Sequence, residues 1–201
     1  MNYKRLFEHM QAAKGDFVRA YDTTIEAWSR ALDLREQQTD GHTLRVAEMV
    51  IKLAHAFDLP EDELLHIRRG CLLHDVGKLS VPEHILLKPS GLTEGEWARM
   101  RTHPQYAHAL LKPITLLAPA LDIPYCHHEK WDGTGYPRGL IGNEIPLTAR
   151  LFAIVDVWDV LTSDRPYRSA WSEKETLIYI RGQSGKHFDP YVVEAFLKMI
   201  A

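Results

Sequence analysis

Apolar side chains recur at three- and four-residue spacing through most of this chain, and this spacing constrains its fold more than any other feature. In residues 42–57, "HTLRVAEMVIKLAHAF", the repeat places the apolar side chains on one side of a helix. Little of the sequence alternates apolar and polar residues as a half-buried strand does. We therefore predict an all-α fold, with helices at about 16–36, 42–57, 60–75, 93–111, 115–129, 147–163, 172–183 and 190–200.

Length and charge narrow the class of protein. A chain of 201 residues, 45% of them hydrophobic, suits one globular unit. The chain has a net charge of -3, whereas proteins that bind duplex nucleic acid usually have an excess of basic residues. Because it has no apolar run of about 18 residues and no signal-peptide core, we expect a cytoplasmic protein with no membrane segment. Cys71 and Cys126 lack the spacing of a zinc site or a disulfide framework, so we expect reduced thiols.

One long loop interrupts the helical pattern. Residues 130–146 contain four glycines and two prolines, and long loops inside compact domains usually carry function. Two adjacent histidines, His127 and His128, stand directly before this loop. The chain has eleven histidines, and a single histidine is more often a surface or hydrogen-bonded residue than a ligand. The clustering of some of them, such as His74 beside Asp75, points instead to a metal site.

Carboxylates in apolar surroundings support a metal site. Asp156 lies in the segment "ARLFAIVDVWDVL", where a buried carboxylate is costly unless it is paired or binds a metal. We expect Asp159, one helical turn later, to act as a cap or to hydrogen-bond a ligand. Imidazole and carboxylate without thiolate favour iron, manganese or zinc. Two such ions about 4 Å apart offer a bridging hydroxide and a positive clamp, the usual arrangement for phosphoester hydrolysis.

Five segments together resemble the HD-GYP family, a branch of the HD-domain phosphohydrolases. The resemblance runs from about residue 30 to the C-terminus and includes "LLHDVGKLSVPEHILLKP", "HPQYAHALL" and "HHEKWDGTGYPRG". It also covers "HTLRVAEM" and "GKHFDPYVVEAF". The resemblance implies an HD-domain helical bundle at 36–201, preceded by a helical lead-in or linker at 1–35. The sequence leaves open whether this opening helix is a linker, a dimerisation segment or part of the domain.

The resemblance also implies two metal ions, with Asp75 bridging them. One ion would be held by His42, His74, Asp75 and Asp156, and the other by Asp75, His103, His127 and His128. Iron is the favoured metal, with manganese and zinc as alternatives. Some family members bind a third ion through a glutamate four residues before the first histidine. This chain has Gln38 there, and Glu36 is poorly spaced to replace it, so we expect two ions.

Catalytic and substrate-binding residues are likewise implied by the resemblance. Asp75 and Lys78 are expected to be catalytic. The expected substrate contacts are Lys78, Gly135, Tyr136, Pro137, Arg165 and Arg168. Tyr136 offers a guanine an aromatic face, and the basic residues would give this acidic protein local positive charge for phosphates. Surface solvation is the simpler interpretation of Arg168.

The resemblance implies a phosphodiesterase for the bacterial second messenger cyclic di-GMP. The expected main product is linear pGpG, formed by attack of a metal-bridging hydroxide, and slow onward conversion to GMP stays open. Because metal ligands identify the reaction and not the base, another cyclic dinucleotide such as cyclic GMP-AMP stays open. A third alternative is a docking module whose Gly-Tyr-Pro loop contacts a diguanylate cyclase (GGDEF) domain. A homodimer is also considered.

Overall fold

The computed structural model describes residues 3–36, 41–164 and 168–200. Within them the chain forms α-helices and short 3-10 helices, and no strand. Isolated β-bridges join Asp132 with Ile141 and Ser184 with Phe188. The predicted all-α fold is confirmed. None of the helices in this part of the chain combines the length and the apolar character that a bilayer crossing requires.

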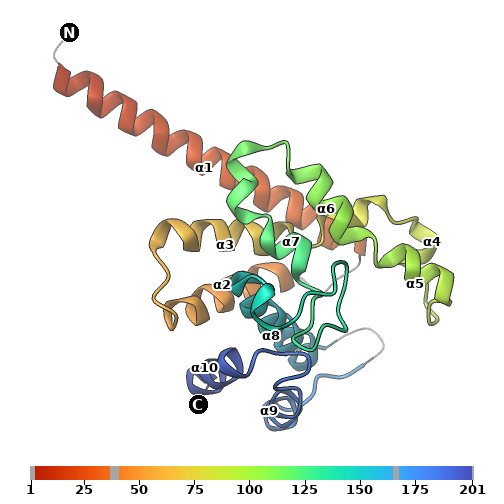
Figure 1. The fold of residues 1–201 in the computed structure, drawn as a ribbon. Helices are drawn as coiled ribbons and strands as arrows, with labels where there is room; N and C mark the ends of the chain where they lie inside the picture. Colours follow the sequence, from red (N-terminus) through yellow and green to blue (C-terminus); the bar gives the residue numbers. More distant parts are fainter. Residues whose placement is uncertain (1–2, 37–40, 165–167, 201) are drawn as a thin grey trace.

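The elements follow one another in the order shown in Figure 1. The α-helices are α1 (Tyr3–Glu36), α2 (His42–His55), α3 (Glu61–Leu73), α4 (Glu83–Leu86), α5 (Glu94–Met100), α6 (His103–Leu111), α7 (Asp122–Cys126), α8 (Leu147–Thr162), α9 (Glu173–Gly182) and α10 (Pro190–Ile200). The 3-10 helices are η1 (Val76–Ser80), η2 (Thr115–Ala120) and η3 (Gly142–Glu144).

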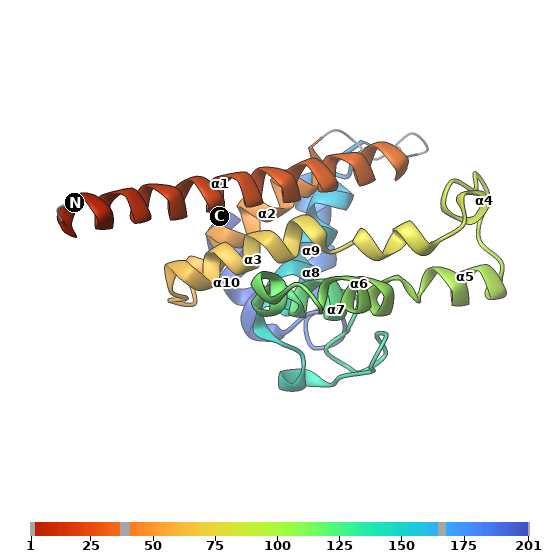
Figure 2. The same cartoon turned by 90° about the horizontal axis from the view of Figure 1, so that it is seen from above.

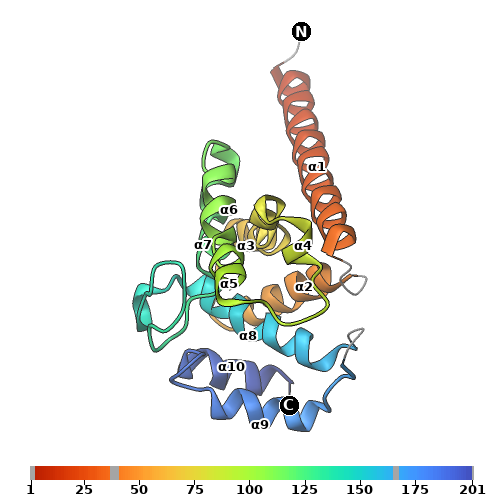
Figure 3. The ribbon, with the colours of Figure 1, turned by 90° about the vertical axis from the view of Figure 1, so that its right-hand side faces the viewer.

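The main core lies between α2, α3, α8 and α10. The helix α8 is apolar on most of its surface, and Leu151, Phe152 and Ile154 are fully buried in it. Figure 3 shows α2 and α3 on one side of α8, and α9 and α10 on the other. Buried side chains from all four helices join those of α8 in this core. A helix buried all round is typical of the centre of a bundle. This places Asp156 of α8 in the middle of the molecule.

A second core cluster joins α1 to the bundle. Ile25 of α1 packs with Leu72, Leu73 and Val76, which lie at the end of α3 and the start of η1. The only buried residues of α1 are Ile25, Ser29 and Leu32, all in its second half. Figure 2 shows the first half of α1 projecting beyond the other helices. The helix begins at Tyr3, whereas the sequence indicated a start near residue 16.

Two predicted helices are each divided in the structure, and prolines lie near both breaks. The segment 93–111 forms α5 and α6, separated at Arg101 and Thr102. Pro104 has no N–H and its ring conflicts with the carbonyl four residues earlier, so the helix restarts at its own N-terminus. The segment 115–129 forms η2, which contains Pro119, and then the short α7. His127 and His128 therefore follow the end of a helix, which corrects the expectation that both lie within one.

The C-terminal helix begins as predicted. The Asp189 carboxylate accepts a hydrogen bond of 2.8 Å from the backbone N–H of Tyr191, so it caps α10. The short elements η1 and α4, between α3 and α5, have too few residues to show a helical repeat in the sequence. Figure 3 shows the chain between α7 and α8 standing out to one side of the bundle as a broad loop.

Candidate metal centre

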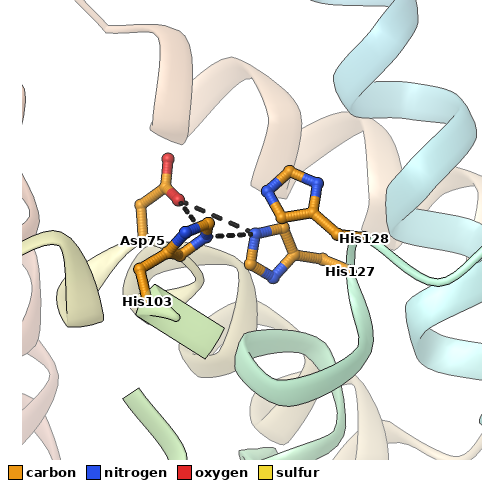
Figure 4. Close-up of side chains that lie close together, drawn as sticks. All are labelled: Asp75, His103, His127 and His128. Carbon is orange, nitrogen blue, oxygen red and sulfur yellow. Dashed lines mark hydrogen bonds and ion pairs between the residues drawn. The ribbon is translucent and has the colours of Figure 1, made fainter. Parts of the chain in front are cut away.

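The seven side chains expected to bind metal all lie among the described residues and gather in two adjoining clusters. Asp75, His103, His127 and His128 form the first cluster, and His42, His74 and Asp156 form the second. Within each cluster, one ligand atom per residue lies within 4.8 Å of the others. We call these the Asp75 cluster and the Asp156 cluster. Figure 4 shows the Asp75 cluster, with the ring atoms of His103 and His127 directed at the carboxylate.

Helix ends supply most of these side chains. His42 is the first residue of α2 and His103 the first of α6, while His74 and Asp75 follow the end of α3. The close approach of η1 to α6 depends on a glycine, because a Cβ atom at Gly77 would lie 1.8 Å from the carbonyl oxygen of His103. Any other residue there would separate the two segments that carry Asp75 and His103.

Asp75 lies between the two clusters. Its Oδ2 atom is 3.0 Å from Nε2 of His74 and 2.6 Å from Nζ of Lys78. Its Oδ1 atom faces the other way, 3.3 Å from Nε2 of His103 and 3.7 Å from Nε2 of His127. Oδ1 is buried and accepts no hydrogen bond from the described residues. A buried carboxylate oxygen without a hydrogen-bond donor fits a position beside a cation.

The charges around Asp75 keep it ionised. Burial alone would raise the pKa of its carboxyl, but His74 and Lys78 hold that pKa well below its usual range. The ammonium of Lys78 in turn has a raised pKa, because Asp75 and Glu36 outweigh the effect of burial. Asp75 is therefore a carboxylate with one oxygen directed at each cluster, which is the geometry of a bridging ligand.

Backbone carbonyls orient three of the histidines. The Nδ1–H groups of His74 and His103 donate to carbonyl oxygens three residues earlier, at 2.8 and 2.9 Å. His127 donates similarly to Ile123 at 3.1 Å. These bonds direct each Nε2 at the centre of the site. Nε2 of His103 and Nε2 of His127 lie 3.2 Å apart, and a cation beside both would relieve the repulsion of their lone pairs.

Two imidazoles of the Asp75 cluster, those of His127 and His128, favour the neutral form. Burial lowers the pKa of His127 to about 4. Burial, followed by the neighbouring His127 and His103, holds the pKa of His128 well below its usual value. A neutral imidazole is the form that binds metal. The buried ring of Phe152 lies against His74 and His127, with centroids 4.8 and 5.8 Å away, and forms an apolar floor beneath both rings.

The Asp156 cluster is held by a carboxylate behind it. Nδ1–H of His42 donates to Oδ2 of Asp159 at 2.6 Å, and Arg45 donates to Oδ1 of the same carboxylate at 2.8 Å. The hydrogen bond expected of Asp159 is confirmed. Nε2 of His42 lies 3.3 Å from Oδ1 of Asp156. Burial would lower the pKa of His42, but its bonds to Asp156 and Asp159 raise it to about 9.

The donor set of both clusters fits a first-row divalent ion. It consists of imidazole nitrogens and carboxylate oxygens, oriented by hydrogen bonds to carbonyls and to Asp159, and it contains no thiolate. Cys71 and Cys126 are buried, and burial raises the pKa of both thiols. These residues therefore have the ligand types and the spacing of a metal site.

Glu36, which is poorly spaced in the sequence to bind a third ion, lies at the site in the structure. Glu36, at the end of α1, accepts a hydrogen bond of 2.8 Å from Nζ of Lys78, and its side chain is only 6% exposed. Arg35 donates to the carbonyl oxygens of Lys78 and Val81, at 2.8 Å each. The end of α1 is therefore fastened to η1. No sequence signal pairs Glu36 with Lys78, because 42 residues separate them.

The Gly-Tyr-Pro loop folds back over the Asp75 cluster. The ring of Tyr136 stacks on His128 with centroids 4.7 Å apart, and its N–H donates to the carbonyl of His128 at 3.1 Å. A Cβ atom at Gly135 would lie 2.3 Å from the backbone N of Lys130, so only glycine allows this approach. Burial raises the pKa of Tyr136 to about 12, which keeps its hydroxyl protonated.

A buried glutamate fixes the same loop. Both carboxylate oxygens of Glu129 accept backbone N–H bonds, from Arg138 at 2.7 Å and from Leu140 at 3.0 Å. Glu129 is 2% exposed. Glu129 is not among the site residues predicted from the sequence, although its position directly after His127 and His128 indicates that it lies near them. Its role is to hold the loop, in which the half-buried Pro137 follows Tyr136.

Arg168 contacts the end of α8. Its guanidinium donates to the carbonyl oxygen of Val160 and lies over the ring of Trp171. Among the described residues these groups, and not the two clusters, are its neighbours. Its expected contact with substrate stays a prediction. Arg165 and Gln38 lie outside the described residues.

Comparisons with known proteins agree with this geometry. A family model for the HD domain matches residues 26–192. A 3'3'-cGAMP-specific phosphodiesterase 2 of Vibrio cholerae is 40% identical over 172 residues, which cover 85% of this chain and 33% of that protein. The cyclic di-GMP phosphodiesterase response regulator RpfG of Xanthomonas campestris is 38% identical over 195 residues, covering 96% and 52%. The chain thus spans between a third and about half of these relatives.

Solved structures share the fold. A cyclic GMP-AMP specific phosphodiesterase of V. cholerae superimposes with a TM-score of 0.69 at 22% identity, covering 88% of this chain and 48% of that one. An HD-GYP-type protein of Bdellovibrio bacteriovorus gives a TM-score of 0.62 at 19% identity, covering 79% and 51%. The family match, the identity to the relatives and the order of the motifs lead to one conclusion: the chain belongs to the HD-GYP branch of the HD-domain family.

Proposed function

We propose that this chain is a metal-dependent phosphodiesterase that hydrolyses cyclic di-GMP, mainly to linear pGpG. The observation that carries the proposal is the meeting of seven ligand side chains in two clusters, with an oxygen of Asp75 directed at each. The name of the relative RpfG, a cyclic di-GMP phosphodiesterase, supports this choice of substrate.

The proposal assigns two ions to each chain. Membership of the HD-domain family implies divalent metal binding, and the ligands of the two clusters suit iron, with manganese and zinc as alternatives. When bound, two such ions activate water as a nucleophile and neutralise phosphate charge. Asp75 would join the two ions, with His42, His74 and Asp156 on one side and His103, His127 and His128 on the other.

The remaining residues of the site would hold the substrate. Lys78 places its ammonium beside Asp75, where it can meet a phosphate oxygen, and its side chain is 17% exposed. Tyr136 presents a protonated hydroxyl and an aromatic ring next to His128, suited to a guanine. Gly135 allows the backbone to approach. The same loop is our proposed contact for a GGDEF domain, because it stands out from the bundle (Figure 3).

A second substrate is favoured by a specific observation. Proteins named as 3'3'-cGAMP-specific phosphodiesterases are 34% to 40% identical to this chain, and those named for cyclic di-GMP are 36% to 41% identical. The two dinucleotides share both phosphodiesters and one guanine and differ only in the second base. The two clusters act on the phosphate, so discrimination would come from the groups that contact the bases.

The test is a comparison of the two substrates on one preparation. The chain is purified without oxygen and loaded separately with iron, manganese or zinc, and turnover of cyclic di-GMP and 3'3'-cGAMP is followed by chromatography. We expect faster cleavage of cyclic di-GMP, with iron or manganese giving the active enzyme. Faster cleavage of 3'3'-cGAMP would favour the second substrate, and full activity with zinc alone would reject the metal assignment.

A further inference from the structure

The helix α1 has an apolar stripe that the bundle does not cover. Its members follow each other at alternating three- and four-residue steps, the heptad spacing of helices that pair with other helices. They are Tyr3, Leu6, Met10, Ala13, Phe17, Ala20, Thr24, Ala27, Ala31 and Leu34, and all ten are exposed. We call this set the exposed seam. The hydroxyl of Thr24, its one polar member, already donates to the carbonyl of Ala20 at 2.8 Å.

The exposed seam is separate from the face that packs on the bundle. At 100° per residue, the seam positions from Ala20 to Leu34 are centred roughly 150° around the helix from the buried Ile25, Ser29 and Leu32. In Figure 1 the bundle lies along one side of α1, and the first half of the helix stands clear of it. A second helix could therefore lie along the seam without meeting the bundle.

Leaving such a surface in water is unfavourable. Tyr3 is 89% exposed, Phe17 57% and Leu34 76%, and two further large apolar side chains flank the seam, Phe7 at 63% and Trp28 at 50%. Contiguous apolar surface of this kind marks an interaction site in soluble proteins. The heptad spacing identifies the occupant as another helix with the same spacing, because a/d side chains pack into a facing set of their own kind.

The distribution of side-chain size makes the seam complementary to itself. Its first half is mostly large, with Tyr3, Leu6, Met10 and Phe17, and its second half is mostly small, with Ala20, Thr24, Ala27 and Ala31. In an antiparallel pair with Tyr3 level with Leu34, large residues lie opposite small ones at three levels, Leu6 with Ala31, Met10 with Ala27 and Phe17 with Ala20. A two-fold pair of this kind is closed, since the same patch serves both copies.

Charge also favours the antiparallel orientation. In a parallel pair, Arg30 would lie beside Arg35 of the second copy. Arg35 is already bonded to the carbonyls of Lys78 and Val81, so it cannot turn away without losing these bonds. The antiparallel orientation keeps Arg30 and Arg35 of the two copies apart.

We propose that α1 forms an antiparallel pair with α1 of a second copy of this chain along the exposed seam. The helices overlap fully when Tyr3 of one copy lies level with Leu34 of the other. The first half of each helix, which has no partner in the bundle, is then covered by the second half of the other copy. This inference concerns assembly and is independent of the proposed phosphodiesterase activity.

Sedimentation of the whole chain tests the pairing. The variant Ala20→Glu places a charge in the centre of the seam, and Ala12→Glu makes the same change at an exposed position of α1 outside it. We expect the mass of two chains for the wild type and for Ala12→Glu, and at least a tenfold higher dissociation constant for Ala20→Glu. Circular dichroism should show equal helix content for the two variants, so that a difference in mass reflects the pairing and not unfolding of α1. A wild-type protein with the mass of one chain, or equal dissociation of both variants, overturns the proposal.

Spin labels test the orientation. Glu8→Cys places a label on the side of α1 away from the seam, and the two native cysteines are buried and so resist labelling. In the fully overlapped antiparallel pair, residue 8 lies level with residue 29 of the second copy, so the labels are about 32 Å apart along the axis. A parallel pair would bring them to the same level. A broad distance distribution centred above about 30 Å is expected, and a short label-to-label distance overturns the antiparallel pair.

Discussion

At the scale of single residues, the second layer around the ligands determines how well the site binds metal. The Asp159 carboxylate accepts one hydrogen bond from Nδ1–H of His42 and another from Arg45. Backbone carbonyl oxygens accept the corresponding hydrogen bonds from His74, His103 and His127. A side-chain substitution cannot remove these acceptors. The Asp156 cluster is therefore the one whose orientation can be altered without touching a ligand.

Replacing Asp159 with Asn should weaken metal binding in the Asp156 cluster. The amide can still accept from His42, but it lacks the charge that fixes the ring, and such changes typically cost about 10- to 100-fold in metal affinity. Titration with a metal indicator measures this. The control is Asp62→Asn, an exposed carboxylate in the first turn of α3. Equal affinities in the two variants would contradict the orienting role.

The raised pKa of His42 makes metal binding dependent on pH. With a pKa of about 9, His42 is protonated at pH 7 in the metal-free protein, and the proton must leave before Nε2 can bind an ion. Affinity in this cluster should therefore rise from pH 7 towards pH 9, and metal addition at pH 7 should release protons. Calorimetry in buffers of different ionisation enthalpy counts them. Uptake without proton release would be inconsistent with this pKa.

Replacing Glu36 with Gln should loosen Lys78. The ammonium of Lys78 would keep its ion pair with Asp75 but lose the charged partner at position 36. We expect this loss to lower the free energy of unfolding by about 1–3 kcal/mol. If Lys78 meets a phosphate, KM for the dinucleotide should rise more than kcat falls. Melting and steady-state kinetics measure both effects, with the exposed Glu8→Gln as control. Unchanged KM with lowered stability would make Glu36 a structural residue alone.

Residue identities in the site were predictable, but their spatial partners were only partly so. The seven expected ligands followed from the resemblance, and the hydrogen bond of Asp159 followed from its place one turn after Asp156. The Glu36–Lys78 pair could not be predicted, because the spacing of residues along the chain does not show that the end of α1 lies beside η1. Arg168 illustrates the reverse problem, since a basic residue near a site in sequence can contact a helix end.

At the scale of elements, short helices and breaks bring the ligands together. The break before α6 places His103 at a helix start, and the early end of α7 lets His127 and His128 turn towards Asp75. The sequence predicted longer continuous helices here, because apolar spacing continues across both breaks. Pro104 and Pro119 were the local signals for them, whereas η1 and α4 are too short to give a periodic signal.

The loop after His128 should lose its position when Gly135 is replaced by Ala. The new Cβ would lie 2.3 Å from the N atom of Lys130 and 2.5 Å from Cα of Glu129, so the loop and Tyr136 must move. Misplacement of a substrate contact by about 1 Å can cost about a hundredfold in rate. We expect turnover to fall by about that much with metal content unchanged.

The matched control is Gly91→Ala, where an added Cβ meets no atom within 4 Å. Its turnover and metal content should equal those of the wild type. If Gly135→Ala retained wild-type turnover, the loop would have no part in holding the substrate.

At the scale of the whole molecule, the residue at position 38, just before α2, should determine whether the reaction stops at pGpG or continues to GMP. The chain has Gln38 where some family members have a glutamate for a third ion. Without that anchor for the new terminal phosphate, pGpG should accumulate, and Gln38→Glu should raise the rate of GMP formation. Each 1.4 kcal/mol of lost stabilisation slows the second cleavage about tenfold. A time course with GMP and no pGpG build-up would contradict this.

The most direct test of the two-ion account is metal content measured together with turnover of cyclic di-GMP, for the wild type and for Asp75→Asn. Both proteins are loaded without oxygen, and their metal is counted per chain by mass spectrometry. We expect two ions per wild-type chain, and for Asp75→Asn a loss of metal and a rate at least about a hundredfold lower, because Asp75 serves both clusters. Fewer than one ion per wild-type chain, or a wild-type rate in Asp75→Asn, would contradict the account.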